Sequence, residues 1–294
     1  MKRTLAVVVA ATALVVSACG SKEDLGGGGQ QAASGEVVVG SADFTENKIL
    51  AEIYAGALKA TGANVTVKAG IGARELVVKA LQDKSLGVVP EYTGNLLNYF
   101  DKTNTTTEAE EVYTALKSKT PLGLEVLEKS DAEDKDVLVV TKATADGGVK
   151  SIADLGSGKY ALGAAGEWAQ RWEAKIQELY GVKFTEIKTT DTGGPITVDA
   201  LKDGTVQVAN LYTTSADIKA NDFVELDDPK VMYPAQNVVP LLRSDAVDAK
   251  GKDALNKVSA ALTTEKLADL VKRVDVDKET IANVAADFLK SVTL

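Results

Sequence analysis

The sequence predicts an α/β protein of two lobes, each built on a doubly wound sheet. From residue 36 onward, short apolar runs with strand character alternate with segments of helical periodicity, which is typical of a parallel sheet with crossover helices. About 260 residues follow the N-terminal segments. This is too many for a single small hydrophobic core and suits two lobes. A stretch with helical periodicity from residue 245 to the end completes the pattern.

The N-terminal residues predict export. Two basic residues are followed by the apolar stretch 5–16 and by Ser17-Ala18, so we expect residues 1–18 to be a lipoprotein signal peptide. The stretch 16–19 (VSAC) resembles a bacterial lipobox, in which Cys19 carries the lipid; the alternative is an ordinary signal peptide that happens to contain a cysteine. Residues 19–35 hold four consecutive glycines and predict a flexible tether. The expected location is the extracytoplasmic face of the cell membrane, with the chain anchored by lipid.

The next part of the chain alternates strands and helices. Residues 36–40 (EVVVG) predict a buried strand, and the loop after it leads into a helix with Thr45 as its N-cap. An apolar stripe at helical spacing marks that helix, which Gly62 ends. The elements expected after it are a strand at 65–67, a helix that starts after 70–72, a strand that ends before Pro90, and helices at 95–100 and 107–119.

A second unit opens near residue 141, after a strand at 137–140. The charged run 131–136 (DAEDKD) lacks the oxygen spacing and central glycine of a calcium loop, so it predicts solvent-facing surface. The elements expected after it are strands at 160–163, 184–187, 206–211 and 238–242, and helices at 167–180 and 196–202. The helices of the C-terminal tail are expected to pack on the first lobe.

Composition excludes several classes of function. The chain has a net charge of −9 and no long basic run, which argues against a nucleic-acid partner. It contains no histidine and only one cysteine, so the commonest general base and metal ligand are missing. We therefore expect no enzyme activity, no cofactor and no metal.

The stretch 89–94 (VPEYTG) places an aromatic ring, a carboxylate and a hydroxyl side by side after a strand-like segment. One interpretation is that Tyr92 forms a wall of a cage for a cationic ligand. The other is that this stretch simply ends a strand and turns into a helix. The residues alone leave both interpretations open.

The order of the motifs resembles that of ABC-transporter binding proteins for glycine betaine, carnitine and choline. The resemblance covers residues 36–294 and rests on five stretches: 39–46 (VGSADFTE), 70–72 (GIG), 90–94 (PEYTG), 212–214 (YTT) and 233–241. It implies a type II periplasmic-binding-protein fold joined by a two-strand hinge, with 36–140 and 236–294 as lobe I and 141–235 as lobe II. A monomer would close on a solute between its lobes and deliver it to a membrane permease.

The ligand implied by the resemblance is a quaternary ammonium or zwitterionic osmoprotectant. Such a group has no N–H to donate, so aromatic faces must hold it, each contributing roughly 0.5 to 2 kcal/mol. The cage tyrosines would be Tyr92, Tyr212 and Tyr233, since each lies at a strand end or in a crossing loop. The predicted ligand-binding residues are Asp43, Phe44, Thr45, Arg74, Tyr92, Thr93, Trp168, Arg171, Tyr212, Thr213, Thr214 and Tyr233.

Several roles stay open at this stage. Phe44 either lines the cleft or staples the helix after it, and Trp168 either lines the cleft or packs in the core. Arg74 and Arg171 could each bind a ligand carboxylate. The chain departs from the family pattern at Gly72-Ala73-Arg74, where relatives show a Gly-Gly-Thr type of turn, and at Ser215, where aspartate is frequent. By recruiting a ligand carboxylate, Arg74 would favour betaine-like zwitterions over choline.

Three alternatives compete with the quaternary ammonium receptor. The same fold could bind a non-quaternary solute such as an amino acid, an ergothioneine-like betaine or an aromatic compound. An enzyme on this scaffold would need a base that the sequence does not offer. An adhesion or scaffold lipoprotein would explain the anchor but not the aromatic residues at the strand ends.

Overall fold

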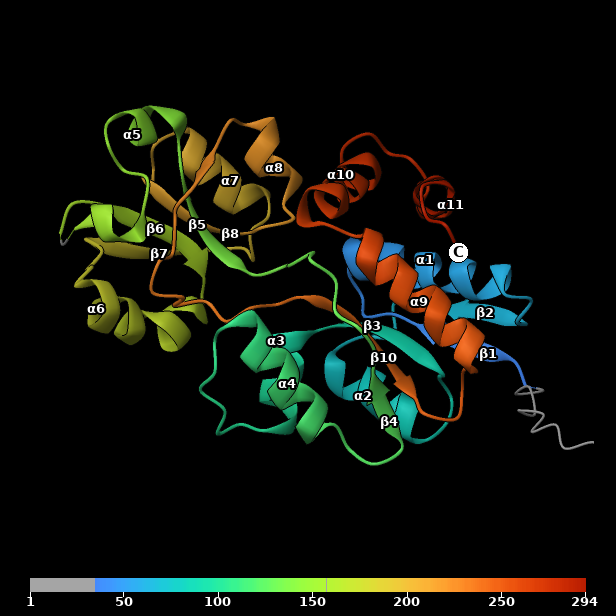
Figure 1. Ribbon diagram of the computed structural model, residues 1–294. Helices are drawn as coiled ribbons and strands as arrows, with labels where there is room; N and C mark the ends of the chain where they lie inside the picture. Colours follow the sequence, from blue (N-terminus) through green and yellow to red (C-terminus); the bar gives the residue numbers. More distant parts are fainter. Residues whose placement is uncertain (1–34, 157) are drawn as a thin grey trace, which may run out of the picture. The chain divides into compact units, whose positions relative to one another are not determined.

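The computed structural model describes residues 35–156 and 158–294 (Figure 1). The predicted signal peptide, Cys19 and the tether up to residue 34 lie outside the described residues. Among the described residues, no helix is both long enough and apolar enough to cross a membrane. The structure contains two five-stranded sheets, each with helices around it, and the chain alternates strands and helices as the sequence predicts.

The first sheet has the strand order β2-β1-β3-β10-β4. β1 pairs in parallel with β2 and β3, but β10 is antiparallel to both of its neighbours, so the sheet is mixed rather than wholly parallel. Its strands are β1 (Val37–Gly40), β2 (Val65–Lys68), β3 (Val88–Tyr92), β4 (Leu124–Val126) and β10 (Val238–Arg243). The helices around it are α1 (Thr45–Ala60), α2 (Arg74–Gln82), α3 (Thr93–Phe100), α4 (Ala109–Lys119), α9 (Ala249–Ala261), α10 (Thr264–Asp275) and α11 (Ile281–Lys290).

β3 is the central strand of the first sheet and contains the first four residues of the VPEYTG stretch, 89–92. It ends later than the sequence predicts, which was before Pro90. The strand runs through Pro90 to Tyr92 and is buried along its whole length. Pro90 lies opposite Pro240 of β10. The carbonyl oxygens of these two residues point away from each other, toward Asn47 Nδ2 and Leu127 N, so this is a non-hydrogen-bonded pair and the two prolines cost the β3–β10 ladder no hydrogen bond. The strand therefore delivers Glu91 and Tyr92 at its carboxyl end.

The α1 helix is the core element of the first lobe. Its predicted apolar stripe is confirmed, because Ile49, Leu50 and Ile53 are all fully buried. The tail helices α9, α10 and α11 pack against it, as expected. The prediction that Thr45 caps the helix is wrong: Phe44 occupies the N-cap position without a side-chain cap, and the Thr45 hydroxyl instead donates to Asp275 Oδ1 at 2.9 Å.

The second sheet has the strand order β7-β6-β8-β5-β9. β6 is parallel to β7 and β8, and β5 is antiparallel to β8 and β9. The strands are β5 (Asp136–Val140), β6 (Ala161–Ala165), β7 (Glu186–Thr190), β8 (Val208–Tyr212) and β9 (Val224–Glu225). The helical segments are α5 (Lys142–Asp146), η1 (Ile152–Leu155), η2 (Ala169–Glu173), α6 (Ala174–Tyr180), α7 (Pro195–Lys202) and α8 (Ala216–Ala220).

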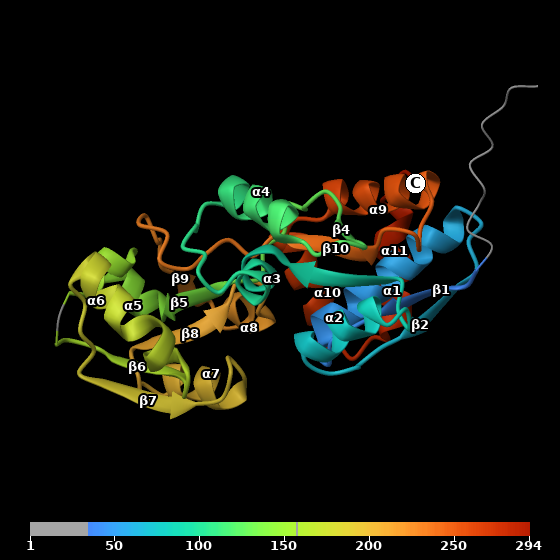
Figure 2. The same cartoon turned by 90° about the horizontal axis from the view of Figure 1, so that it is seen from below.

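Two segments of the chain cross between the sheets, just before β5 and just before β10 (Figures 1 and 2). They hydrogen-bond to each other, since Asp134 N donates to Gln236 O at 3.2 Å and Glu133 pairs with Asn237 as an antiparallel bridge. Because β5 belongs to the second sheet from Asp136 onward, the first crossing precedes Asp136 instead of lying at residue 140. The charged run 131–136 is thus the first crossing, and only Asp131 in it is largely exposed, which corrects its prediction as solvent-facing surface.

Candidate ligand-binding site

A cleft of about 1020 Å³ lies between segments of the two sheets. The first sheet contributes the loop after β1, the start of α2 and the end of β3, and the second sheet contributes the segments after β7 and β8. Sheets with parallel strands place ligands at the carboxyl ends of these strands. The first crossing and the C-terminal end of α10 complete the lining through Asp134 and Asp275.

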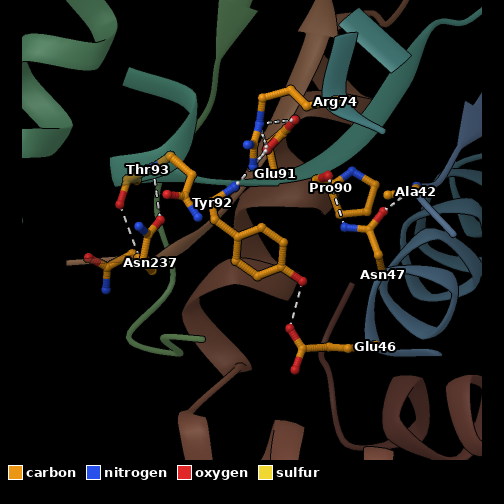
Figure 3. Close-up of polar contacts among 11 residues, drawn as sticks. Ala42, Glu46, Asn47, Arg74, Pro90, Glu91, Tyr92, Thr93 and Asn237 are labelled. Carbon is orange, nitrogen blue, oxygen red and sulfur yellow. Dashed lines mark hydrogen bonds and ion pairs between the residues drawn. The ribbon is translucent and has the colours of Figure 1, made fainter. Parts of the chain in front are cut away.

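Tyr92 lines the cleft at the end of β3, but only 5% of its surface is exposed. Its hydroxyl donates to Glu46 Oε1 at 2.6 Å (Figure 3). The ring of Phe44 stacks beside it, with 6.1 Å between the ring centroids and 30° between the planes. Burial and the neighbouring carboxylates hold the pKa of Tyr92 well above its usual value. Phe44 therefore lies against Tyr92 and lines the cleft, which is one of the two positions that the sequence left open for it.

Tyr212 lies across the cleft, at the end of β8. Gly193, in the loop after β7, makes room for it: a Cβ at Gly193 would lie 3.2 Å from a ring carbon of Tyr212, and its φ of +70° already favours glycine. Burial raises the pKa of the Tyr212 hydroxyl. The strand end and the glycine loop together fix the ring at the cleft.

A pair of acidic side chains lies beside Tyr92. Thr214 donates to Asp134 Oδ1 at 2.9 Å, and Glu46 Oε2 is buried without a hydrogen-bond partner among the described residues. Burial first, and then the charge of Asp134, raise the pKa of Glu46 to about 8. Burial likewise raises the pKa of Asp134 to about 6. Two carboxyl groups this close cannot both ionise easily by themselves, and a cation bound beside them would favour the charged form of both.

Arg74 is held by a different partner than the sequence suggests. Its Nε donates to both oxygens of Glu91, at 2.9 and 3.0 Å, and its Nη2 donates to Glu91 Oε2 at 2.9 Å (Figure 3). Glu91 is 4% exposed, and a buried carboxylate needs such a forked partner. The guanidinium lines the cleft but is committed to Glu91, so the structure does not leave Arg74 free for a ligand carboxylate.

The remaining predicted aromatic residues are in the core of the second lobe. Trp168 and Tyr233 are 1% and 3% exposed, and Trp168 Nε1 donates to the Tyr233 hydroxyl at 2.9 Å. Trp172 packs edge-on against Tyr233, with 5.0 Å between the ring centroids. Neither Trp168 nor Tyr233 is among the residues that line the cleft. The structure therefore does not bring Tyr233 together with Tyr92 and Tyr212.

Arg171 also lies away from the cleft lining. Its Nη2 is 3.6 Å from Asp136 Oδ2, and its guanidinium lies over the ring of Trp172, 5.0 Å from the centroid. Like Arg74, it already has an acidic partner.

The predicted threonines divide into two groups. Thr93 and Thr213 fasten the crossings: Thr93 Oγ1 donates to Ala235 O at 3.3 Å, and Thr213 Oγ1 donates to Glu133 O at 2.8 Å. By contrast, Thr45 and Thr214 line the cleft. Asp43 lines it too and pairs with Lys48, with Oδ1 2.6 Å from Nζ. Ligand contact by Thr45, Thr214 and Asp43 stays a prediction.

Sequence reasoning missed several residues of the cleft. Glu46 belonged to the loop predicted after the first strand, Asn47 to the helix predicted after that loop, and Asp134 to the predicted surface turn. Asn47 Nδ2 donates to Pro90 O at 3.2 Å and so holds the loop after β1 against β3 (Figure 3). Asp275 had no local signal, because it is far along the chain in a tail helix. No group of three or more candidate metal ligands occurs within the described residues.

Comparison with known proteins gives matches over most of the chain. The family model OpuAC, the substrate binding domain of ABC-type glycine betaine transport systems, matches residues 35–291. A glycine-betaine-binding protein of Pseudomonas aeruginosa is 28% identical over 271 residues, which are 86% of this chain and 86% of that protein.

Solved structures also resemble this one. Apo YehZ from Escherichia coli has a TM-score of 0.74 and 26% identity, over 88% of this chain and 99% of that one. A glycine betaine/carnitine/choline ABC transporter structure has a TM-score of 0.81 and 20% identity, over 87% of this chain and 98% of that one. The α/β fold with two lobes is therefore that of periplasmic binding proteins.

Proposed function

Because the chain belongs to the family of substrate binding domains of ABC-type glycine betaine transport systems, we propose that it is the extracytoplasmic solute-binding component of an ABC importer. It binds a quaternary ammonium osmoprotectant between its lobes and delivers it to a membrane permease. The P. aeruginosa relative, named a glycine-betaine-binding protein, supports this class of ligand.

One observation carries the proposal: aromatic rings from both lobes line the cleft beside a carboxyl pair. Phe44 and Tyr92 come from the first lobe and Tyr212 from the second. Ring faces attract a trimethylammonium group, which offers no N–H to a hydrogen-bond acceptor. Asp134 adds negative charge at the same place, and Glu46 can ionise when a cation binds beside it. A solute without a cationic group would gain little from this combination.

The N-terminal residues support lipid anchoring at Cys19 of the exported chain. Attachment to the outer face of the membrane would keep the receptor close to its permease. Cys19→Ser should release the protein from the membrane fraction, while the wild-type chain expressed in a bacterial host should incorporate labelled palmitate. A wild-type chain that takes up no label would remove the anchor from the proposal.

Calorimetric titration with glycine betaine, choline, carnitine and proline betaine tests the function. At least one of these ligands should bind, and its dimethylamine analogue should bind more weakly because the contacts of one methyl group with the rings are lost. No heat from any of them at millimolar concentration would contradict the proposal.

Tyr92→Ala locates the site within the same experiment. Loss of one ring should weaken binding about 2- to 30-fold, from roughly 0.5 to 2 kcal/mol per ring. Tyr99→Ala is the matched control, because Tyr99 is 37% exposed and does not line the cleft. An unchanged affinity for Tyr92→Ala would remove Tyr92 from the site.

A further inference from the structure

The charge of the cleft is strongly one-sided. Among the described residues that line it, Arg74 is the only Lys or Arg. The acidic side chains of the lining are Asp43, Glu46, Glu91, Asp134, Asp217 and Asp275. Such a set attracts a cation and repels a free carboxylate.

Two of these acidic groups are already neutralised, Asp43 by Lys48 and Glu91 by Arg74. No Lys or Arg of the described chain lies within ion-pair distance of the other four. Glu46 is the most informative of them, because its Oε2 is buried in the wall of the cleft and has no hydrogen-bond donor in the described structure. A buried carboxyl oxygen without a donor is costly unless a ligand compensates it.

A ligand carboxylate finds few partners in this cleft. Arg74 and Arg171 are held by Glu91 and Asp136. The N-terminus of α7 is closed by Asp191, whose carboxylate accepts hydrogen bonds from the backbone N–H groups of Gly194, Ile196 and Thr197. The N-terminus of α2 has no side-chain cap, but a helix end carries only about half a positive charge. Glu46 and Asp134 line the same cleft and oppose that partial charge when ionised.

We propose that the cleft selects a quaternary ammonium alcohol or ester with net positive charge, the choline class, over zwitterionic betaines, and that Glu46 and Asp134 determine this selectivity. The inference rests on the proposed function, since the rings must hold the trimethylammonium group in both cases. A betaine carries its carboxylate within a few bonds of the ammonium group, so the carboxyl pair repels one end of the ligand while attracting the other.

Ligands that share one head group provide the test on the unaltered protein. Choline, glycine betaine and phosphocholine all carry a trimethylammonium group and differ in charge at the other end. Calorimetry at pH 7.5 and low salt should give a dissociation constant for choline at least tenfold below that for glycine betaine, with phosphocholine the weakest. Glycine betaine binding as tightly as choline, or more tightly, would overturn the inference and leave the proposed function standing. If none of the three binds, the inference fails, and if carnitine and proline betaine do not bind either, the proposed function fails with it.

Neutral variants assign the selectivity to the two side chains. Glu46→Gln and Asp134→Asn should each weaken choline binding about tenfold and leave glycine betaine binding equal or tighter, so that the ratio of the two dissociation constants collapses. Glu265→Gln is the matched control, since it removes the same charge from an exposed position of α10 outside the cleft. Circular dichroism melting verifies that each variant folds. Folded variants that keep the wild-type ratio would show that other groups determine selectivity.

Discussion

At the scale of single residues, the unusual feature is a glutamate buried beside a second carboxyl group. Glu46 is the second residue of α1 and accepts a hydrogen bond from the Tyr92 hydroxyl. Its carboxyl group lies close enough to that of Asp134, in the first crossing, for the two to interact electrostatically. In the unfolded chain such a carboxyl group ionises near pH 4.5, whereas burial raises the pKa of folded Glu46 to about 8. The folded state therefore holds a proton that the unfolded state has lost across this range.

This difference predicts how stability changes with pH. The contribution of Glu46 is fully present below pH 4.5 and is lost as pH rises through about 8, so the free energy of unfolding should fall by up to roughly 1.4 kcal/mol per pH unit in this window. Glu46→Gln has no proton to release but still accepts from Tyr92, so it should flatten the dependence. Urea unfolding of the ligand-free protein between pH 4.5 and 8.5 measures both curves.

The comparison between variants isolates Glu46 from other titrating groups. Glu265→Gln should reproduce the wild-type curve, because its side chain is exposed. Parallel curves for wild type and Glu46→Gln would show that the folded Glu46 titrates like an exposed carboxyl group.

At the scale of elements, the sequence predicted most strands and helices but not the direction of the strands. Period and apolar runs identify β1, β3 and β6 because each is a largely buried segment with clear ends. They do not show that β5 and β10 are antiparallel, since both directions have the same alternation of side chains. The shortest strands, β4 and β9, carry too few residues for any periodic signal.

The same limit explains which site residues could be predicted. Tyr92 and Tyr212 are the last residues of β3 and β8, whose carboxyl ends meet at the cleft, so a strand pattern could place both there. Ligand contact by either residue stays a prediction. Tyr233 lies in the segment between β9 and β10, where its position depends on packing with Trp168. Glu46 and Asp134 reach the cleft only through contacts between distant parts of the chain, which no local pattern reveals.

Tyr233→Phe separates a core role from a cage role. The change removes the hydroxyl that accepts from Trp168 Nε1 and leaves a buried donor unpaired, so the free energy of unfolding should fall by about 1 to 3 kcal/mol. Ligand affinity should stay within twofold of wild type, in contrast to Tyr92→Ala. Urea unfolding and calorimetry give the two quantities. Unchanged stability with a large loss of affinity would return Tyr233 to the site.

At the scale of the whole molecule, the cleft is built so that a ligand bridges two lobes. Tyr92 belongs to the first sheet and Tyr212 to the second, while Thr93 and Thr213 hold the crossings that join them. A ligand that touches both rings makes its full set of contacts only when the lobes are close. It must therefore shift the population toward a closed state, by as much as its affinities for the open and closed states differ.

Fluorescence energy transfer between labels on the two lobes should report this closure. Leu76 at the start of α2 and Ile196 at the start of α7 are exposed and belong to different lobes, so cysteines at both positions in a Cys19→Ser background can carry a dye pair. Saturating ligand should raise the transfer efficiency, with a midpoint at the calorimetric dissociation constant. A pair at Leu76 and Leu122, both exposed and both in the first lobe, should not respond. Ligand binding without any change in the transfer efficiency of the first pair would mean that the lobes already have the ligand-bound arrangement before binding. The crossings would then be rigid connections rather than a hinge.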